Sequence, residues 1–577
     1  MKKYNWKKRR WEDTNSRKSI KAIDKVKIKK DKKETAKKGY LPNNVSNDDS
    51  GNNIEVEKLR EKKRKELLEK RGKGSRTTIY DQVLNKLVIT AILLVLQVFL
   101  LIEGYNKVEI GNAEKIINEI LRILSITLIV ISPENPGMKL SWLIIVGIFP
   151  IFGSITYIIF GNTKSYEQLK RRVEKGRENI SGSKVDDSKI IAKQEGNLKR
   201  VVTYLSTYND FPVYENTEVD YIPLGDDILQ SFIKDIRSAK KSIYLEFFII
   251  STGVMWDMLK EELMIKAKEG LDVRIIYDDV GSTTKMPIRE IREVKKAGVK
   301  VARCNPVLPK LSLIYNSRDH RKIMIIDDTI GYMAGINIGD EYINVYHRAG
   351  FWKDVGFRAV GEGVHGMTKI FMEMWTTITD EKENLDEHIP TKSSESEGIV
   401  LPFAEVPGDD ELVMKTTFMQ LIWGAKESIE ITTPYLILDN EMSEALIAAA
   451  KRGVDVRIVV PGIPDKRLVY EITKSTFYEY VKAGIKIFLY NPGFIHAKML
   501  LFDRKTSIIG SMNQDFRSMY LQFESATLFT STKVAKEMGR DLDEIYMVST
   551  RVNEKDAKRS IFQKIRQGFL RILAPLF

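Results

Sequence analysis

The stretch HAKMLLFDRKTSIIGSMN, residues 496–513, carries polar side chains at both ends of an apolar middle. Side chains two residues apart share one face of a strand, so His496 and Lys498 point the same way. The β-rich run TSIIG starts a second strand after a turn candidate, which predicts a hairpin. With a two-residue turn at 504–505, His496 faces Asn513 and Lys498 faces Ser511. Four polar groups then converge on one patch.

Asp503 lies just before this predicted turn. It follows His496 by seven residues, which is roughly 23 Å along an extended strand. On distance alone, we interpret Asp503 as a structural turn residue and not as a proton donor to the patch.

A second copy, HRKIMIIDDTIGYMAGIN, covers residues 320–337. With a turn at Asp328-Thr329, His320 faces Asn337 and Lys322 faces Gly335. A single patch of this kind is commonly the ordinary end of a sheet, but two copies in one chain indicate that the pattern has a function.

The two hairpins belong to a longer internal repeat. AKKSIYLEFFI from Ala239 matches AKESIEITTPYLIL from Ala425, and KAKEGLDVRIIY from Lys266 matches AAKRGVDVRIVV from Ala449. The first copy carries an insertion, 307–319, just before its motif, where a loop would lie beside the patch and shape substrate entry. Each copy reads strand, helix, strand, helix, strand and then hairpin. The pattern predicts an α/β fold, with two mixed sheets flanked by helices that pack with pseudo-twofold symmetry around one shared patch.

These motifs resemble the phospholipase D superfamily, whose mark is a duplicated HxKxxxxD segment followed by GSxN. The second copy fits completely, whereas AGIN in the first copy places Ala334 and Gly335 where the family often has Gly and Ser. The flanking runs AGINIGDEY, FWKDVGFRAVGEGV and GSMNQDFRSMYLQFE are similar to bacterial cardiolipin synthases. The resemblance covers roughly residue 221 to the C-terminus together with the membrane segments.

The resemblance implies a catalytic set of two triplets: His320, Lys322 and Asp327; His496, Lys498 and Asp503. The lysines would neutralise a phosphodiester, one imidazole would attack phosphorus, and the other would move protons. By resemblance His320 is the nucleophile, although the sequence itself leaves the two histidines nearly symmetric. The expected phosphate-binding residues are Asn337, Ser511 and Asn513.

Carboxylates are expected to orient the two imidazoles. The resemblance points to Glu524 for the second motif and to Asp354 for the first, with Glu246 a weaker candidate on the first strand. No metal or cofactor is expected, because Cys304 and the three remaining histidines show no ligand spacing. We interpret Cys304 as a core residue and His365 and His388 as surface residues.

Charge is concentrated in the N-terminal tail. Residues 1–86 hold 28 Lys and Arg against 13 Asp and Glu, whereas the whole chain has a net charge of +14. The tail is predicted to be largely disordered, with a possible helix at 56–71. Two readings stay open for it, attraction to an anionic membrane or a solvated arm. Nucleic-acid binding is not expected, because interleaved aromatic residues are missing.

Three apolar stretches follow: 87–102, 116–132 and 141–160. The last has 20 uncharged residues, enough to span about 30 Å as a helix, although Pro150 and Gly153 would kink it. We expect two or three transmembrane helices and a multi-pass protein of the cell membrane. Basic residues after 160 favour a cytoplasmic catalytic region.

The predicted organisation has six parts: a basic tail at 1–82, a membrane region at 83–160, a charged helical linker at 161–215, two phospholipase D-like halves at 216–390 and 391–550, and a basic amphipathic helix at 551–577. That helix either lies at a membrane interface or packs on the second half. The sequence leaves the oligomeric state open.

The resemblance supplies a specific reaction, in which two phosphatidylglycerol molecules give cardiolipin and free glycerol. Rival hypotheses change the acceptor: water makes a phospholipase D hydrolase, and another alcohol makes a different phosphatidyltransferase. A nuclease or a lipid-binding protein without activity fits the residues less well.

Overall fold

The computed structural model describes residues 2–5, 10–13, 112–132, 134–160, 164–305, 317–394, 396–409 and 411–573. Contacts divide the chain into two units, Met1–Ile102 and Glu103–Phe577. In the first unit, β1 (Lys2–Asn5) and β2 (Arg10–Asp13) form an antiparallel pair, within a tail whose sequence predicts disorder. The possible helix at 56–71 and the apolar stretch 87–102 lie outside the described residues.

The first half of the second unit is built on a seven-stranded mixed sheet with the order β4-β12-β10-β9-β5-β6-β7. Strands β5, β6 and β7 run parallel, and β9, β10, β12 and β4 extend the sheet antiparallel. Their bounds are β4 Thr217–Ile222, β5 Ser242–Phe247, β6 Asp272–Asp278, β7 Lys300–Cys304, β9 Lys322–Ile326, β10 Ile330–Ala334 and β12 Gly356–Gly361.

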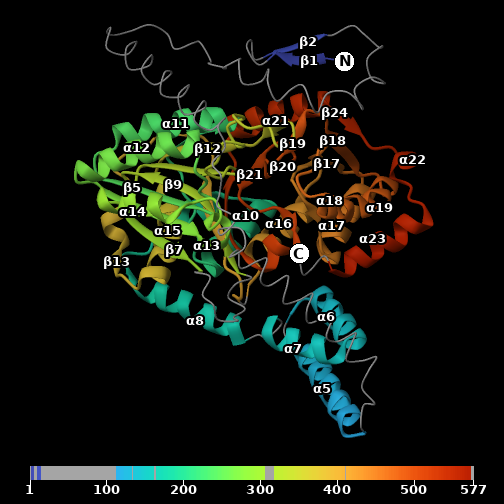
Figure 1. The fold of residues 1–577 in the computed structure, drawn as a ribbon. Helices are drawn as coiled ribbons and strands as arrows, with labels where there is room; N and C mark the ends of the chain where they lie inside the picture. Colours follow the sequence, from blue (N-terminus) through green and yellow to red (C-terminus); the bar gives the residue numbers. More distant parts are fainter. Residues whose placement is uncertain are drawn as a thin grey trace, which may run out of the picture. The chain divides into compact units, whose positions relative to one another are not determined.

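The second half repeats this topology with the order β14-β23-β21-β20-β15-β17-β18 and adds β24 at the edge. The duplicated α/β units with mixed sheets therefore confirm the predicted fold class (Figure 1). The bounds are β14 Val400–Glu405, β15 Ser428–Thr432, β17 Asp455–Pro461, β18 Lys486–Tyr490, β20 Met499–Phe502, β21 Thr506–Gly510, β23 Gln522–Phe529 and β24 Ser549–Arg551.

Helices cover these sheets. In the first half they are α11 Gly225–Ser238, α12 Val254–Lys268, α13 Asp279–Ser282, α14 Ile288–Lys296 and α15 Val364–Thr379. In the second half they are α16 Val413–Gly424, α17 Asn440–Lys451, α18 Arg467–Ser475, α19 Phe477–Lys482, α20 Phe516–Tyr520 and α21 Thr532–Met547. One apolar core runs through both halves, and the Phe357 and Phe529 rings, one from each half, lie 4.7 Å apart.

Each polar hairpin turns over three residues, so both predicted registers were wrong by one position. The ladders pair Ile323 with Met333 and Met499 with Ile509. Asp327 and Asp503 both have a φ angle of 51°, and the residues that follow them, Asp328 and Arg504, have φ angles of 53° and 50°. Asp tolerates this left-handed conformation, which lets the longer turn form.

Short strands join the two halves immediately before each motif histidine. β8 (Arg318–Asp319) pairs in parallel with the start of β23, and β11 (Phe351–Lys353) pairs in parallel with β19 (Gly493–Ile495). These two pairings are related by the pseudo-twofold repeat. We call the junction that they form the seam. Its symmetry decides where the two histidines lie.

The apolar region before the first sheet forms three helices, α5 Asn112–Ile131, α6 Pro136–Ile148 and α7 Pro150–Phe160. The single helix expected at 141–160 was wrong, because α6 ends before Pro150, whose ring cannot continue a helix and lacks an N–H donor. Gly153 lies so close to α6 that an added Cβ would be 2.6 Å from Val146 Cα. Across the described residues, the helices are all too short or too polar to cross a bilayer.

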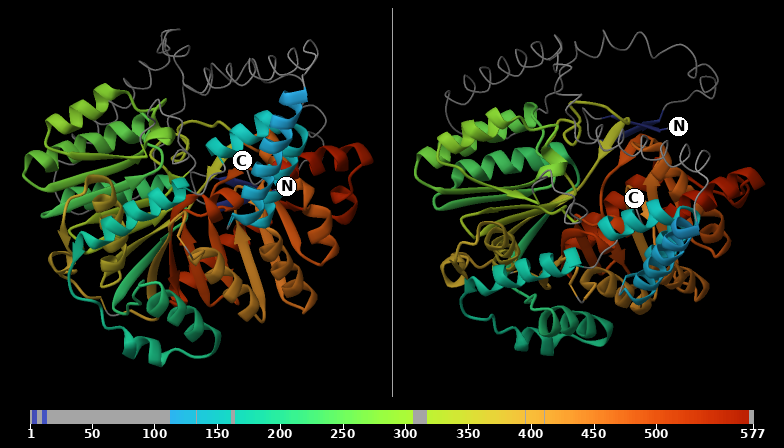
Figure 2. Two further views of the ribbon diagram at one scale, coloured as in Figure 1. Left: turned by 90° about the horizontal axis from the view of Figure 1, so that it is seen from below. Right: turned by 60° about the horizontal axis from the view of Figure 1, so that its bottom comes forward.

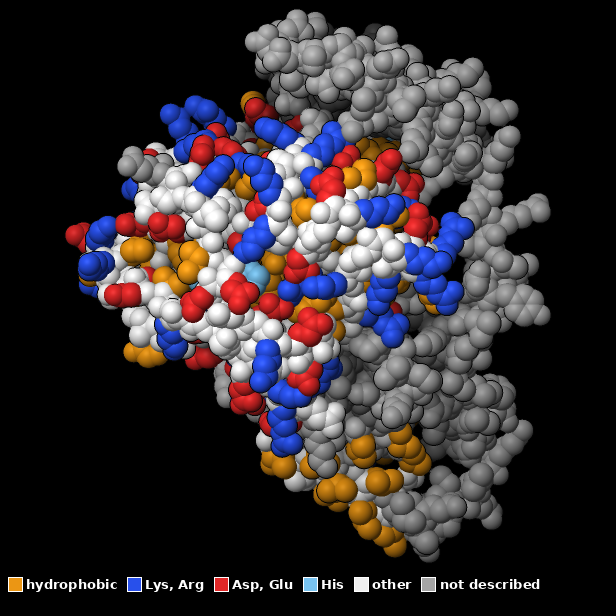
Figure 3. Space-filling view, turned by 90° about the vertical axis from the view of Figure 1, so that its left-hand side faces the viewer, with side chains coloured by type: hydrophobic (Ala, Val, Ile, Leu, Met, Phe, Trp, Pro, Cys, Tyr) orange, Lys and Arg blue, Asp and Glu red, His pale blue; other side chains and the backbone are white. Residues whose placement is uncertain are grey.

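These three helices expose many large apolar side chains. Figure 3 shows them gathered at the lower end of the molecule, where α5 and α7 lie. They include Ile116, Ile120, Ile123, Leu124, Leu128 and Ile131 of α5, Leu140 and Ile148 of α6, and Ile151, Ile155 and Ile158 of α7.

The predicted charged linker is helical but packs closely on the body. It contains α8 Lys164–Glu178, α9 Ser188–Lys193 and α10 Gly196–Thr203. Gly176 of α8 lies so close to Thr377 of α15 that an added Cβ would overlap it, and Leu169 is buried. At the other end of the chain are α22 Glu554–Ala557 and α23 Ile561–Leu573.

Two smaller sequence expectations can be compared with the structure. Cys304 is buried in the core, as expected. The surface interpretation of His365 and His388 was wrong, because both are buried. His388 Nδ1 lies 3.0 Å from Asp328 Oδ1 in the first hairpin turn.

Candidate active site

The backbone of the seam fixes the position of both motif histidines. His320 N–H donates to Phe523 O at 2.9 Å, and His496 N–H donates to Lys353 O at 2.7 Å. Phe523 directly precedes Glu524, and Lys353 directly precedes Asp354. Each histidine is therefore held beside the carboxylate of the opposite half.

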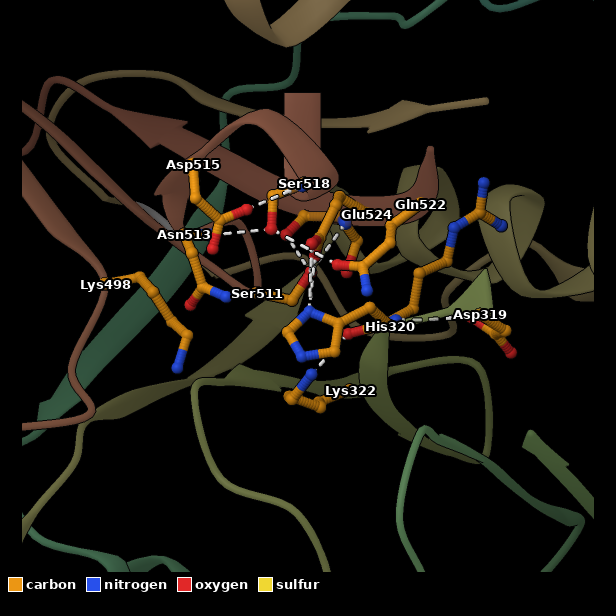
Figure 4. Close-up of polar contacts among 12 residues, drawn as sticks. Asp319, His320, Lys322, Lys498, Ser511, Asn513, Asp515, Ser518, Gln522 and Glu524 are labelled. Carbon is orange, nitrogen blue, oxygen red and sulfur yellow. Dashed lines mark hydrogen bonds and ion pairs between the residues drawn. The ribbon is translucent and has the colours of Figure 1, made fainter. Parts of the chain in front are cut away.

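The imidazole of His320 makes its hydrogen bond to Glu524. Its Nδ1 lies 2.9 Å from Oε1 and 3.0 Å from Oε2 of a carboxylate that is fully buried (Figure 4). Burial alone would raise the pKa of Glu524, but His320, Lys322 and the Ser511 hydroxyl lower it below its ordinary value. An ionised carboxylate can only accept, so Nδ1 carries the proton and Nε2 keeps its lone pair.

His496 has the equivalent partner in Asp354. Its Nδ1 lies 2.5 Å from Asp354 Oδ2, and the N–H of Val355 donates to the other oxygen at 2.9 Å. A Cβ on Gly335 would lie 2.0 Å from Asp354 Oδ1. The Asp354 side chain therefore fills the space that a Ser side chain at position 335 would need.

Two expectations about these groups need correction. Sequence reasoning paired each carboxylate with the histidine motif of its own half, whereas the structure crosses them. It also expected Ser511 to bind phosphate, but the Ser511 hydroxyl donates to Glu524 Oε2. The crossing could not be read from one motif, because the seam strands that cause it are short and carry no sequence signature of their own.

The two lysines lie against the histidines that they accompany. Lys322 Nζ donates to His320 O, and Lys498 Nζ lies 2.8 and 3.0 Å from the two ring nitrogens of His496. Burial is the main cause that lowers the pKa of Lys322 to about 7 and that of Lys498 to about 8. Both lysines are therefore poised to gain a full positive charge when an anion binds beside them.

Charge interactions show that the two His-Lys pairs form one site. Lys498 of the second half is close enough to lower the pKa of His320, and Lys322 of the first half does the same to His496. Burial is the larger cause, and the pKa values fall to about 4 and about 3 respectively. Figure 4 shows His320, Lys322, Lys498 and Asn513 around the same pocket.

The two motif asparagines lie beside this pocket. Asn337 donates through Nδ2 to the Tyr342 hydroxyl at 2.6 Å and accepts from Ile249 N–H at 3.2 Å. Asn513 Oδ1 is buried without a hydrogen-bond partner among the described residues. Asn513 thus has a free acceptor atom, which can receive a donor of a ligand but cannot bond to a phosphate oxygen.

Asp327 and Asp503 lie at the far ends of their hairpins. The Asp327 carboxylate accepts from the N–H groups of Lys240, Lys241 and Ser242, and Asp503 accepts from those of residues 426–428. Both carboxylates thus tie a hairpin turn to the start of the first strand of their half. This geometry agrees with the distance argument and gives neither aspartate access to the pocket.

Aromatic side chains around the imidazoles were not singled out from the sequence. The rings of Tyr342 and Trp352 lie 5.4 and 5.5 Å from the ring of His496, and the ring of Phe248 lies 5.1 Å from that of His320. Tyr342 and Trp352 both lie within the quoted flanking runs, which could have suggested them. Glu246 is also buried, 3.7 Å from Arg321 Nη1, and does not bond to either histidine.

Such an arrangement suits chemistry at a phosphodiester. Two neutral imidazoles, two ammonium groups and an amide surround one pocket, so an anion there is neutralised while one ring nitrogen attacks and another moves a proton.

Comparisons with known proteins place this geometry in a family. Residues 232–353 and 418–546 match the family described as "Cardiolipin synthase, PLD-like domain", and residues 120–162 match "Phospholipase_D-nuclease N-terminal". A cardiolipin synthase of Halalkalibacterium halodurans is 33% identical over 78% of this chain and 91% of its own length. An uncharacterized protein of Streptococcus mutans is 35% identical over 76% of this chain and 96% of its own length.

A solved structure shares the fold. The crystal structure of phosphatidylserine synthase from Haemophilus influenzae matches with a TM-score of 0.51 and 14% identity, over 66% of this chain and 99% of that one. Because sequence identity with the cardiolipin synthases extends over three quarters of the chain and both motif halves, the chain belongs to the cardiolipin synthase family of phospholipase D-like proteins.

Proposed function

We propose that this chain joins two phosphatidylglycerol molecules into cardiolipin and glycerol through a phosphohistidine on His320. Family membership makes the chain an enzyme of the phosphatidyltransferase type. The observation that carries the proposed mechanism is the crossed pairing of His320 with Glu524 and of His496 with Asp354. It gives two imidazoles with fixed tautomers around one cationic pocket.

The surroundings of the two rings support His320 as the nucleophile. Lys498 Nζ lies 3.0 Å from His496 Nε2, so its ammonium engages the lone pair that an attack would need. Both lysines donate to the backbone oxygen of their own histidine, and among the described residues only Lys498 also lies within hydrogen-bond distance of its histidine ring. Glu524, bonded to both Nδ1 and Ser511, holds the His320 ring with Nε2 directed into the pocket (Figure 4).

In the first step, His320 Nε2 attacks the phosphorus of one phosphatidylglycerol. An N–P bond forms, the P–O bond to the terminal glycerol breaks, and His496 passes a proton from the Lys498 ammonium, 3.0 Å from its Nε2, to the departing oxygen. The phosphate anion between the lysines raises the pKa values of His496 and both ammonium groups, which makes His496 a proton donor once substrate is bound.

In the second step, a glycerol hydroxyl of another phosphatidylglycerol attacks the same phosphorus. His496 accepts the hydroxyl proton, a P–O bond forms, and the N–P bond to His320 breaks. The products are cardiolipin and regenerated imidazole. One phosphodiester replaces another, so the reaction is reversible and is drawn forward by removal of glycerol.

Attachment to the cell membrane fits these lipid substrates. We place the catalytic region on the cytoplasmic side because basic residues follow the apolar region. Protease accessibility of the tail in sealed vesicles tests the topology. An even number of membrane crossings puts the tail on the same side as the catalytic halves, and an odd number puts it on the opposite side.

The function itself is tested with purified protein and radiolabelled phosphatidylglycerol in micelles. Cardiolipin and glycerol in equal amounts support the proposal, and acid-labile label on wild-type protein that His320→Ala lacks supports the phosphohistidine. If phosphatidic acid is the main product, the activity is hydrolysis and not cardiolipin synthesis. No turnover in wild-type protein would overturn the proposal.

A further inference from the structure

Helix α23 turns an apolar surface away from the fold that it packs on. Its inner side is narrow: Leu570 packs with Ile437 and Ile472, and Gln567 is buried. An ion pair of 2.6 Å joins Arg566 to Glu471 of α18. Ordinary terminal helices bury their apolar side chains, so this inner side does not account for the apolar composition of α23.

The outer side of α23 carries four large apolar residues. Ile561, Phe562, Ile565 and Phe569 are 70, 81, 66 and 61% exposed. At 3.6 residues per turn, these positions fall within about a third of the helix circumference, so they form one continuous stripe. Figures 1 and 2 show α23 on the outside of the second half beside α18. Exposed apolar stripes of this size mark binding surfaces.

Cations border the stripe on both sides. Lys564 and Arg571 lie along one edge of the helix, and Arg566 lies along the other, with all three exposed. An apolar stripe with basic residues on both edges suits the surface of a bilayer that contains anionic lipids. A partner protein would not need cations on both edges.

The end of α23 also contacts α6, one of the three apolar helices. The Ser141 hydroxyl of α6 contacts the backbone oxygen of Ile572 at the end of α23. Asn135, the residue before α6, donates to the Tyr520 hydroxyl at 2.8 Å, in the helix α20 that follows the GSMN motif. Apolar surfaces from opposite ends of the chain thus meet beside the second catalytic motif.

We propose that α23 lies in the surface of an anionic phospholipid bilayer, with Ile561, Phe562, Ile565 and Phe569 among the acyl chains and Lys564, Arg566 and Arg571 at the headgroups. The inference rests on the proposed function in taking membrane lipids as the reactants. Its consequence is a second attachment point, distinct from residues 83–160, that holds the second half against the lipid surface from which substrates enter.

Single-site labelling tests this in the full-length chain. Cys304 is buried, and burial raises the pKa of its thiol, so a thiol-reactive NBD dye will react at an introduced cysteine instead. The two reporters are Phe562→Cys and Phe569→Cys. Gln563→Cys on another side of the same helix and exposed Ile288→Cys on the first half are the matched controls.

The labelled proteins are reconstituted into phosphatidylglycerol–phosphatidylcholine vesicles with nitroxide-labelled lipid as quencher. We expect at least twofold quenching at 562 and 569, and little at 563 and 288. In phosphatidylcholine alone, or with Lys564→Glu and Arg571→Glu combined, the quenching at 562 should fall by at least half.

Equal quenching at 562 and 563 would overturn the inference. So would an emission change at 562 that depends on protein concentration in lipid-free detergent, because it would assign the stripe to a second copy of the chain. Cardiolipin synthesis by the labelled proteins is measured in parallel. If the dyes at 562 and 569 stay in water while cardiolipin synthesis is normal, only the docking of α23 is refuted. If the dyes contact lipid but no cardiolipin forms, only the proposed function is refuted.

Discussion

His320 and Glu524 come from different halves of the chain, yet Nδ1 of the first lies 2.9 Å from Oε1 of the second. The parallel pairing of β8 with β23 produces this contact, and β11 with β19 produces its symmetric counterpart between His496 and Asp354. The two halves consequently depend on each other. Neither half holds a histidine together with the carboxylate that orients it.

Replacing Glu524 by Gln should lower kcat by about 10² to 10⁴-fold. The amide NH₂ would donate to Nδ1 and move the His320 proton to Nε2, which removes the attacking lone pair. Cardiolipin formation from labelled phosphatidylglycerol measures the effect.

Glu405→Gln is the matched control. Glu405 pairs directly with Glu524 in the β14–β23 ladder, is equally buried, and bonds to Met414 N–H but to neither histidine. Burial raises the pKa of Glu405 well above its ordinary value, whereas the neighbours of Glu524 lower the pKa of that carboxyl. Glu405→Gln should keep nearly full activity. Equal losses in both variants would contradict the orienting role of Glu524.

The pH dependence of kcat/KM should show a plateau between about 4 and about 7. Below it, His320, whose pKa is about 4, binds a proton and loses its lone pair. Above it, Lys322, whose pKa is about 7, loses the positive charge that attracts the phosphodiester. Activity therefore falls in both directions, because the free enzyme needs neutral His320 and charged Lys322.

Lys322→Arg tests the assignment of the alkaline limb. An arginine stays charged throughout this range, so the limb should move up to the one set by Lys498, whose pKa is about 8. Rates are normalised to the maximum of each variant, which separates the limb from any loss of overall activity. An unmoved limb would show that another group controls it.

The sequence was sufficient for the α/β fold class of the two repeated halves. Duplicated spacing of His and Lys predicted two mixed-sheet halves that meet at one cationic patch, because hairpin alternation and repeat order are local properties. The hairpin register depended on the backbone at Asp327 and Asp503, where a positive φ adds one residue to each turn. Local patterns do not distinguish two-residue from three-residue turns in such a motif.

The sequence did not correctly predict which carboxylate binds which histidine, for a different reason. Glu524 and Asp354 were identified as the orienting acids, but which histidine each one serves depends on the tertiary pairing of two- and three-residue strands. The break between α6 and α7 was partly foreseen, since Pro150 and Gly153 indicated a kink. The tight packing of Gly153 on Val146 turned that kink into a helical hairpin.

Gly335→Ser, which restores the family's Ser in the first motif, should be harmful. Its Cβ would lie 2.0 Å from Asp354 Oδ1, so Asp354 must move away from His496. Overpacking of this kind costs about 1–3 kcal/mol, and proton transfer by His496 should slow as well. Thermal unfolding and cardiolipin formation measure the two effects. Gly147→Ser, where an added Cβ meets no atom within 4 Å, is the control. Unchanged activity in Gly335→Ser would argue against a fixed Asp354.

Asp503→Asn and Asp327→Asn should destabilise the protein without slowing its chemistry. Each carboxylate accepts three backbone N–H groups that tie a hairpin turn to the first strand of its half. Hydrogen bonds to a charged group contribute about 1.5–3 kcal/mol, and an amide would leave at least one of these N–H groups without its partner. We therefore expect a loss of about 2 kcal/mol in the free energy of unfolding, seen as a lower Tm.

The rate per folded molecule separates this structural role from a catalytic one. Both variants should keep kcat within about twofold of wild type when unfolded protein is removed before the assay, since each aspartate is bonded at the strand end away from the histidines. Asp186→Asn, at an exposed carboxylate that bonds to Ser188, controls for the loss of charge. A normal Tm combined with a kcat reduced a hundredfold or more would instead make Asp503 or Asp327 part of the proton-transfer machinery. Such a variant protein would fold normally and lack only the ionisable group.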